Sequence, residues 1–233
     1  SNSDVLGSAK GWAGGFLYNE KSKLALDNFY KRTDTLSLGI CNGCQLMVEL
    51  DRFIHSPLNP PMGDLKSQVS QLSVDTNLNS SPSERLGGAV SDIFGGAKML
   101  HNDSHKFESG FVGLTIPENN SVMLKSLSGT KLGVWVAHGE GKFQLPKAEN
   151  EYNIIAKYSY DAYPANPNDS DYATAGICSN DGRHLAMMPH PERSIFPWQC
   201  ANYPAERKNT DQVTPWVEAF EYARVWVEEK IQK

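Results

Sequence analysis

The chain has 233 residues, a formal net charge of −5 at pH 7, and 39% hydrophobic and 21% charged residues. This length suffices to bury one α/β core, and an acidic balance without a basic cluster argues against nucleic acid as a partner. No stretch approaches the roughly 20 apolar residues of a membrane span, so we expect no membrane partner and no signal peptide. Four cysteines are too few for a disulfide framework in this chain, which favours a reducing, cytoplasmic location.

The first part of the chain predicts helices around one strand. Glycines are frequent in residues 4–16, which we interpret as a loop leading into a helix. Residues 20–32 have one apolar face and predict a helix that packs on a sheet. An apolar, strand-like run then ends at Ile40, and the helix-like run 45–50 follows. Strand, helix and strand in this order predict an α/β fold, with a mostly parallel central sheet and helices on its faces.

The rest of the chain alternates between loops and short strands. Residues 51–97 are rich in Ser, Asn, Pro and Gly, and predict a polar surface insertion within a single domain that covers residues 1–233. Residues 214–232 predict a helix that Thr214 caps. Strands are expected at 98–101, 111–116, 132–137, 152–160, 174–178 and 184–188.

The stretch that joins the first strand to its helix carries a cysteine between two glycines, Gly39-Ile40-Cys41-Asn42-Gly43. This spacing is typical of a nucleophile elbow, in which a tight strand-to-helix turn requires glycine beside the nucleophile. We expect the sulfur of Cys41 to face open space, and the helix N-terminus to favour its thiolate form. The backbone N–H of Asn42 would point at a developing oxyanion.

A matching base lies near the other end of the chain. An apolar run delivers His190 at a strand end, and Pro191 prevents the strand from continuing. His190 could deprotonate Cys41 and later protonate a leaving amine. Glu192 is close enough in sequence to orient the imidazole. Together, Cys41, His190 and Glu192 predict a nucleophile, a base and an orienting carboxylate.

These motifs resemble those of the triad, or class I, glutamine amidotransferases, and more specifically the glutaminase domains of phosphoribosylformylglycinamidine synthases. The resemblance covers nearly the whole chain outside residues 51–97. The segments that carry it are Asp4-Val5-Leu6-Gly7, Lys10-Gly11-Trp12-Ala13, Gly39 to Gln45, Asn102-Asp103-Ser104, Phe107-Glu108, Val136 to Gly141, Tyr163 to Asn168, Met187 to Arg193 and Thr214-Pro215-Trp216-Val217.

The resemblance implies a flavodoxin-like amidotransferase fold whose first strands precede the chain. It implies hydrolysis of glutamine through a cysteinyl thioester, with Gln45, Asn42, Asn102 and Ser104 around the substrate. Ammonia would pass to a synthetase domain of the same full-length polypeptide, which would use ATP and Mg²⁺. This chain itself would hold no cofactor or metal. A second oxyanion donor would come from an upstream loop, so we expect the isolated fragment to be weakly active or inactive.

Several alternatives stay open. In the similar proteins an arginine usually stands at the position of Gly110. If that arginine pairs with an acidic group or with the substrate, another residue must do so in this chain. His138 and Glu140 follow a strand in a glycine-flanked turn, where they could serve packing, pocket lining or an interdomain contact. Cys44 completes a C-x-x-C with Cys41, which could indicate a redox pair or half a zinc site, but a core position is favoured. The chain could also be another cysteine hydrolase or a non-catalytic interaction domain.

Overall fold

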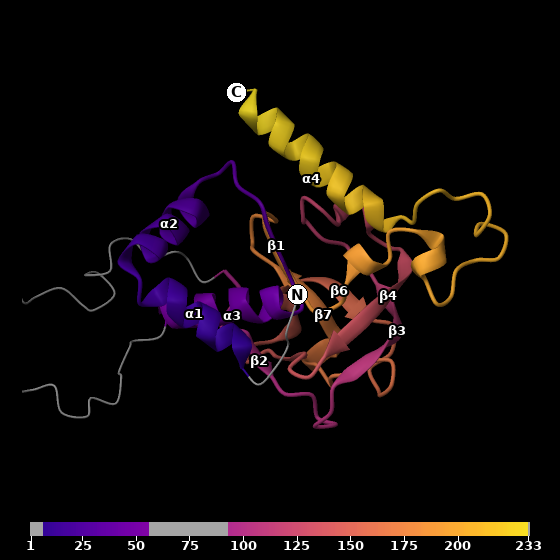
Figure 1. Ribbon diagram of the computed structural model, residues 1–233, viewed down its shortest axis with the longest axis horizontal. Coiled ribbons are helices and arrows are strands. Elements are labelled where there is room, and N and C mark those ends of the chain that lie inside the picture. The colour runs from indigo at the N-terminus through magenta and orange to yellow at the C-terminus, as the bar shows by residue number, and fades with distance from the viewer. Residues whose placement is uncertain (1–6, 56–92, 233) are drawn as a thin grey trace, which may run out of the picture.

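A computed structural model describes residues 7–55 and 93–232 of the chain. Within them, a six-stranded sheet has the order β1-β8-β7-β6-β3-β4. A smaller antiparallel pair joins β2 (Lys98–Leu100) to β5 (Lys142–Gln144). Figure 1 shows α1, α2 and α3 gathered on one side of the sheet, while α4 extends away from the body of the molecule.

The bounds of the elements follow the predicted pattern closely. The α-helices are α1 (Ser8–Leu17), α2 (Glu20–Lys31), α3 (Asn42–His55) and α4 (Trp216–Ile231). The strands of the large sheet are β1 (Ser37–Ile40), β3 (Glu108–Thr115), β4 (Lys131–His138), β6 (Asn153–Tyr158), β7 (Thr174–Cys178) and β8 (His184–Met187). The glycine-rich start is therefore helical from Ser8 onward, because Ala9 and Ala13 bury its inner face.

The α/β class is confirmed, but in the described residues the sheet is mixed and not mostly parallel. Strands β1 and β8 run parallel, with Ile40 beside Met187. The other neighbours, β8 with β7, β7 with β6, β6 with β3 and β3 with β4, run antiparallel. Residues 179–183 form a short turn between β7 and β8, and a turn of this length permits only antiparallel pairing.

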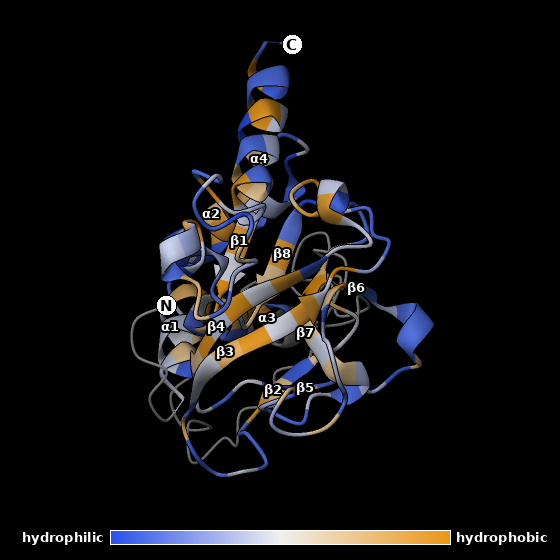
Figure 2. Cartoon of the chain, turned by 90° about the vertical axis from the view of Figure 1, so that its right-hand side faces the viewer, coloured by the Kyte–Doolittle hydropathy of each residue, from blue (hydrophilic) through white to orange (hydrophobic). Residues whose placement is uncertain are grey.

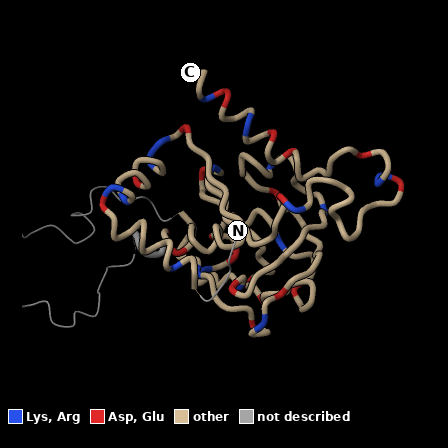
Figure 3. The backbone as a smooth tube through the Cα atoms, viewed as in Figure 1, with Lys and Arg blue, Asp and Glu red and all other residues tan. Residues whose placement is uncertain are grey.

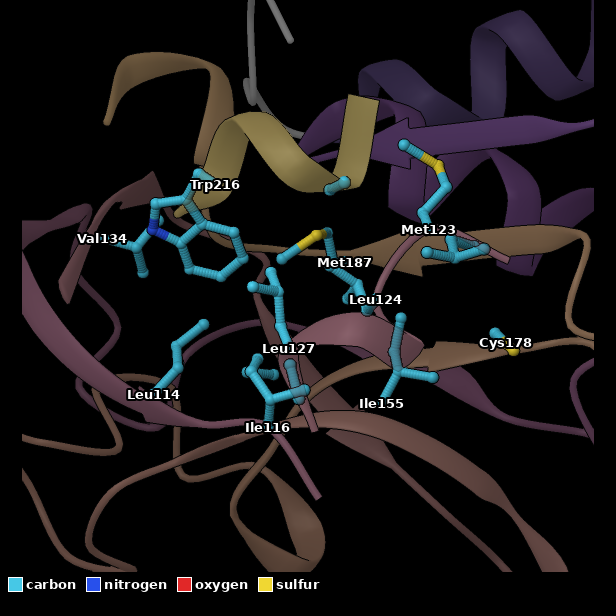
Figure 4. Packing of buried hydrophobic residues seen from close by; sticks show 14 of the residues in the cluster. Leu114, Ile116, Met123, Leu124, Leu127, Val134, Ile155, Cys178, Met187 and Trp216 are labelled. Atoms are coloured by element: carbon cyan, nitrogen blue, oxygen red, sulfur yellow. The ribbon is translucent and has the colours of Figure 1, made fainter. Parts of the chain in front are cut away.

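The sheet separates two apolar clusters. Strand β8 sends Leu185 and Met187 to one face and Ala186 and Met188 to the other, as the two-residue period of a strand requires. Figure 4 shows the first cluster, where Trp216 at the start of α4 packs near Val134, Met187 and the leucines of the segment 123–127. The second cluster joins the inner face of α3 to the opposite face of the sheet.

Two predicted features are corrected by this packing. Thr214 does not cap α4, because its hydroxyl donates a hydrogen bond of 2.5 Å to the carbonyl of Ser194. Residues 51–55 of the predicted insertion continue α3, and the carboxylate of Asp51 accepts the backbone N–H groups of Ile93 and Phe94. The remainder of the insertion, residues 56–92, lies outside the described residues.

Charge and hydropathy are spread over the surface. Figure 3 shows acidic and basic residues interspersed, with both signs along α4. Figure 2 shows apolar positions alternating with polar ones in the projecting part of α4, where Tyr222, Val225 and Ile231 are exposed. Among the described helices, none combines the length and apolarity that crossing a bilayer would need.

Candidate active site

The nucleophile elbow is formed as predicted. Cys41 has a φ of 55°, the left-handed conformation that L-residues rarely adopt and that a nucleophile elbow imposes. A Cβ on Gly39 would lie 2.5 Å from the carbonyl oxygen of Gly43, so the first glycine is required. A Cβ on Gly43 would meet no atom of the described chain within 4 Å. Only the first of the two glycines is therefore needed to relieve crowding.

Cys41 is held at the junction of β1 and α3. Its N–H donates to the carbonyl of Met187 in β8, which extends the parallel pairing by one residue, and its carbonyl accepts the N–H of Gln45. Asn42 is the first residue of α3, so its N–H has no acceptor within the helix and is available to an anion.

His190 and Glu192 form the predicted pair. The Nδ1 atom of His190 lies 2.6 Å from Oε1 of Glu192, and the ring is buried. Burial alone would raise the pKa of Glu192, but the hydrogen bond and charge of His190 more than offset it, so that pKa is lowered. A carboxylate can only accept, so Nδ1 carries the proton and Nε2 is left as the acceptor. Nε2 makes no hydrogen bond within the described chain.

Strand β4 contacts both the predicted nucleophile and the predicted base. The thiol of Cys41 lies 3.6 Å from the carbonyl oxygen of Ala137, and the N–H of His190 donates to the carbonyl of Trp135 at 2.8 Å. Carbonyls two residues apart on a strand point to the same side and are separated by roughly 7 Å. Cys41 and His190 therefore share one edge of β4, although 149 positions of numbering separate them in the sequence.

The same edge of β4 also anchors the last helix. The indole Nε1 of Trp216 donates to the carbonyl of Gly133 at 2.9 Å. Alternate carbonyls of one strand thus hold the start of α4, the base and the nucleophile. Sequence reasoning missed this role, because every residue carries a carbonyl and no side-chain signal marks the strand that uses it.

The elbow thiol does not face open space, which corrects the prediction. Cys41 is 1% exposed and belongs to the second apolar cluster. Its sulfur lies 3.6 Å from the carbonyl oxygen of Ala137, a contact in which a thiol would donate the hydrogen bond. Geometry of this kind in a structure without substrate does not exclude a catalytic role.

The predicted substrate contacts lie around the elbow. The side-chain amide of Asn42 donates to Ser8 Oγ and to Oε1 of Gln45, at 2.7 and 3.1 Å. Gln45 in turn donates from Nε2 to the carbonyl of Glu140 at 3.0 Å. The two amides therefore connect α1, the elbow helix and the turn that follows β4.

Asn102 is buried and its side chain organises that same turn. Its amide donates to the carbonyls of Lys106 and His138, and its Oδ1 accepts the N–H of Gly141. Ser104 is half-buried and accepts the N–H of Lys106 at 3.3 Å. These bonds give Asn102 an evident structural task, whereas its contact with a substrate stays a prediction.

The remaining cysteines differ from Cys41. Cys44 lies on the core side of α3 as predicted, and burial, with a smaller contribution from Cys41, raises the pKa of its thiol well above the usual range. Burial likewise raises the pKa of Cys178 to about 12, and Figure 4 places this residue in the first cluster. Neither thiol is suited to act as a nucleophile near neutral pH.

His138 does not compete with His190 for the carboxylate. Its buried ring packs against Gly141, where a Cβ would collide with it and with the amide of Asn168. Glu140 lies near His101, with 3.4 Å between Oε1 and Nε2. The turn after β4 therefore serves both packing and the lining of the elbow.

Comparisons with known proteins identify the family of the chain. A family model described as the CobB/CobQ-like glutamine amidotransferase domain matches residues 1–84 and 90–227. A probable phosphoribosylformylglycinamidine synthase, chloroplastic/mitochondrial, from Arabidopsis thaliana is 38% identical over 98% of this chain. The phosphoribosylformylglycinamidine synthase of Homo sapiens is 37% identical over 97% of it. The chain spans only 15% and 16% of the lengths of these relatives.

A solved structure of PurLQS from Thermotoga maritima superimposes with a TM-score of 0.57 at 19% sequence identity, covering 92% of this chain and 72% of that one. At this identity the likeness supports the fold alone. The family model, in contrast, matches most of the chain. The chain therefore belongs to the CobB/CobQ-like glutamine amidotransferase domain family.

Proposed function

We propose that the chain is the glutaminase domain of a phosphoribosylformylglycinamidine synthase, and that it hydrolyses glutamine to glutamate and ammonia for purine biosynthesis. One observation carries the proposal: Cys41, in a left-handed elbow, shares an edge of β4 with the His190–Glu192 pair. The relatives named as this synthase support the assignment.

In the proposed reaction, Nε2 of His190 takes the thiol proton of Cys41 and the sulfur attacks the side-chain amide carbon of glutamine. The N–H of Asn42 stabilises the oxyanion. The C–N bond then breaks, and the nitrogen leaves as ammonia with the proton from His190. Water, which gives a proton to His190, attacks the thioester and releases glutamate and the Cys41 thiol. Glu192 keeps Nδ1 protonated and stabilises the imidazolium.

The buried thiol adds one requirement to this mechanism. We expect movement of the turn that follows β4 to release the contact between the sulfur and the carbonyl of Ala137, near the end of that strand, and so to admit glutamine. Gln45 and Asn42 link that turn to the elbow helix, so substrate bound near Gln45 would act on both. Asn102 and Ser104 would shape the far side of the pocket.

The longer polypeptide would supply the rest of the reaction. Ammonia would pass to its synthetase portion, where ATP and Mg²⁺ would bind, and we assign no cofactor to the present chain. A cytoplasmic location stays a prediction, and the Arabidopsis relative is named chloroplastic/mitochondrial.

Labelling with a chloroketone analogue of glutamine tests the assignment in the full-length enzyme. We expect one added label on the peptide that contains Cys41, retained in Cys44→Ala and absent in Cys41→Ala. Label on Cys44 would refute the assignment of the nucleophile.

The closed thiol also gives weight to the second candidate, a non-catalytic interaction domain of the same fold. If that candidate holds, the full-length enzyme stays unlabelled and releases no glutamate from glutamine. Release of acid from simple esters or peptides, but not from glutamine, would instead identify another cysteine hydrolase.

A further inference from the structure

One edge of β3 is open along most of its length. Strand β3 pairs with β4 from Glu108 to Thr115, but with β6 only at Leu114 and Thr115. The last contact on that side is the N–H of Ser159 donating to the carbonyl of Gly113. Beyond Ser159 the chain turns away from β3. Figure 2 shows β3 and β4 crossing the face that is turned toward the viewer.

The hydrogen bonds of β4 show which groups of β3 point into this opening. The carbonyls of Trp135 and Ala137 point away from β3, because they bind His190 and Cys41. Residues opposite them in an antiparallel pair must also turn their N–H and C=O groups outward. Those residues are Phe111 and Ser109. Their outward N–H and C=O groups have no partner in the described part of the chain.

A groove accompanies this open edge. It has a volume of about 490 Å³ and runs between β3 and the segment 159–167. Tyr160 and Tyr163 stand at its rim, 74% and 67% exposed. Gly110 lines the groove, and a Cβ there would meet no described atom within 4 Å. The groove is separated from Cys41 by strands β3 and β4.

The chemistry of the groove selects its occupant. Outward N–H and C=O groups at alternate residues are matched by another extended backbone, so a polypeptide strand fits better than a small molecule. Glu108 lines one end and forms no ion pair within the described residues, whereas Lys131 lines the groove and pairs with Thr115 at the opposite end of β3. A basic side chain is therefore favoured beside Glu108.

We propose that an extended segment of the synthetase portion, carrying a basic residue, pairs with β3 at Ser109 and Phe111. This proposal rests on the proposed function, because it places the chain within a longer synthase. An edge of this length makes a small interface, well below the roughly 1,000 Å² of a stable complex between free partners. Covalent linkage removes that obstacle by raising the effective concentration of the segment. The relatives, of which this chain covers 15%, have ample length to provide it.

Residue-resolved amide hydrogen exchange on the full-length enzyme tests the proposal. The amides of Gly110 and Val112 face β4 and serve as internal references. If β3 is paired on both sides, Ser109 and Phe111 exchange as slowly as these references. If the edge is open, the rates alternate along β3, with Ser109 and Phe111 about tenfold faster or more. Alternating rates would overturn the proposal, and so would protection that disappears on dilution, which identifies a second copy as the occupant.

A pair of variants sharpens the test. Proline is tolerated on an open edge but cannot donate a hydrogen bond. Ser109→Pro should therefore release the protection of Phe111, while Ser109→Ala should keep it. Should Ser109→Pro fail to fold, the exchange pattern of the unmodified enzyme still decides. Labelling of Cys41 reports on the proposed function separately, because it does not depend on the β3 edge.

Discussion

Replacing Glu192 with alanine isolates the orienting role of the carboxylate. The change removes the 2.6 Å contact with Nδ1 of His190, a charge-assisted hydrogen bond of about 1.5–3 kcal/mol. The Glu192 side chain is 37% exposed, so solvent screening favours the lower part of this range. A loss of about 2 kcal/mol lowers the glutamine-dependent rate about 30-fold. The ammonia-dependent rate of the full-length enzyme should stay near normal, because that route bypasses the triad.

The assay compares both rates in the same preparation. Arg193→Ala is the matched control, because its Nε lies 3.7 Å from the same carboxylate on the solvent side. We expect this control to change either rate less than about twofold, as is usual for an exposed ion pair. An equal loss of both rates in Glu192→Ala would show that the carboxylate maintains the fold, and no loss would show that His190 needs no orienting partner.

Three further predictions concern stability and are read from thermal or denaturant unfolding. Gly39→Ala places a Cβ 2.5 Å from backbone and should cost about 1–3 kcal/mol, whereas Gly43→Ala should be nearly neutral; equal effects would contradict the elbow packing. Asn102→Ala removes three hydrogen bonds, two of them buried, and should cost about 2–4 kcal/mol, so a loss below about 1 kcal/mol would refute its structural role. Burial would raise the pKa of Asp181, but hydrogen bonds from Ser179 and Arg183 outweigh this effect and lower that pKa. Since a lowered folded-state pKa stabilises above the unfolded value, Asp181→Asn should cost about 1 kcal/mol at neutral pH and progressively less below about pH 4.

The elbow and the contact between His190 and Glu192 could be predicted because their signals are local. Gly39 and Cys41 lie within three residues of each other, and this spacing indicates the tight strand-to-helix turn of a nucleophile elbow. His190 and Glu192 are likewise two residues apart, so a short chain path places the carboxylate beside Nδ1. The helix 20–32 and the paired strands near 111–116 and 132–137 were also recognisable from their periodicity, and α2, β3 and β4 confirm them.

The features that sequence reasoning missed depend on contacts between distant segments. Whether two neighbouring strands run parallel or antiparallel depends on how the connections between them cross the sheet. The apolar periodicity of a strand does not indicate this. Cys41 is buried in a cluster that includes residues far along the chain, such as Phe143 and Met188, and the side chain of Thr214 turns to Ser194 instead of to its own helix. The resemblance implies that Asn102 contacts the substrate, but its neighbours in the sequence do not indicate its hydrogen bonds to the turn after β4.

The alternating carbonyls of β4 make the site unusually sensitive to chain length at this place. Adding or deleting a single residue between Gly133 and Ala137 would rotate the following carbonyls toward β3. Cys41, His190 and Trp216 could then lose their contacts with the β4 carbonyls together, although none of these side chains had changed. Loops elsewhere can lengthen without that penalty, so insertions and deletions should be tolerated around this strand but not within it.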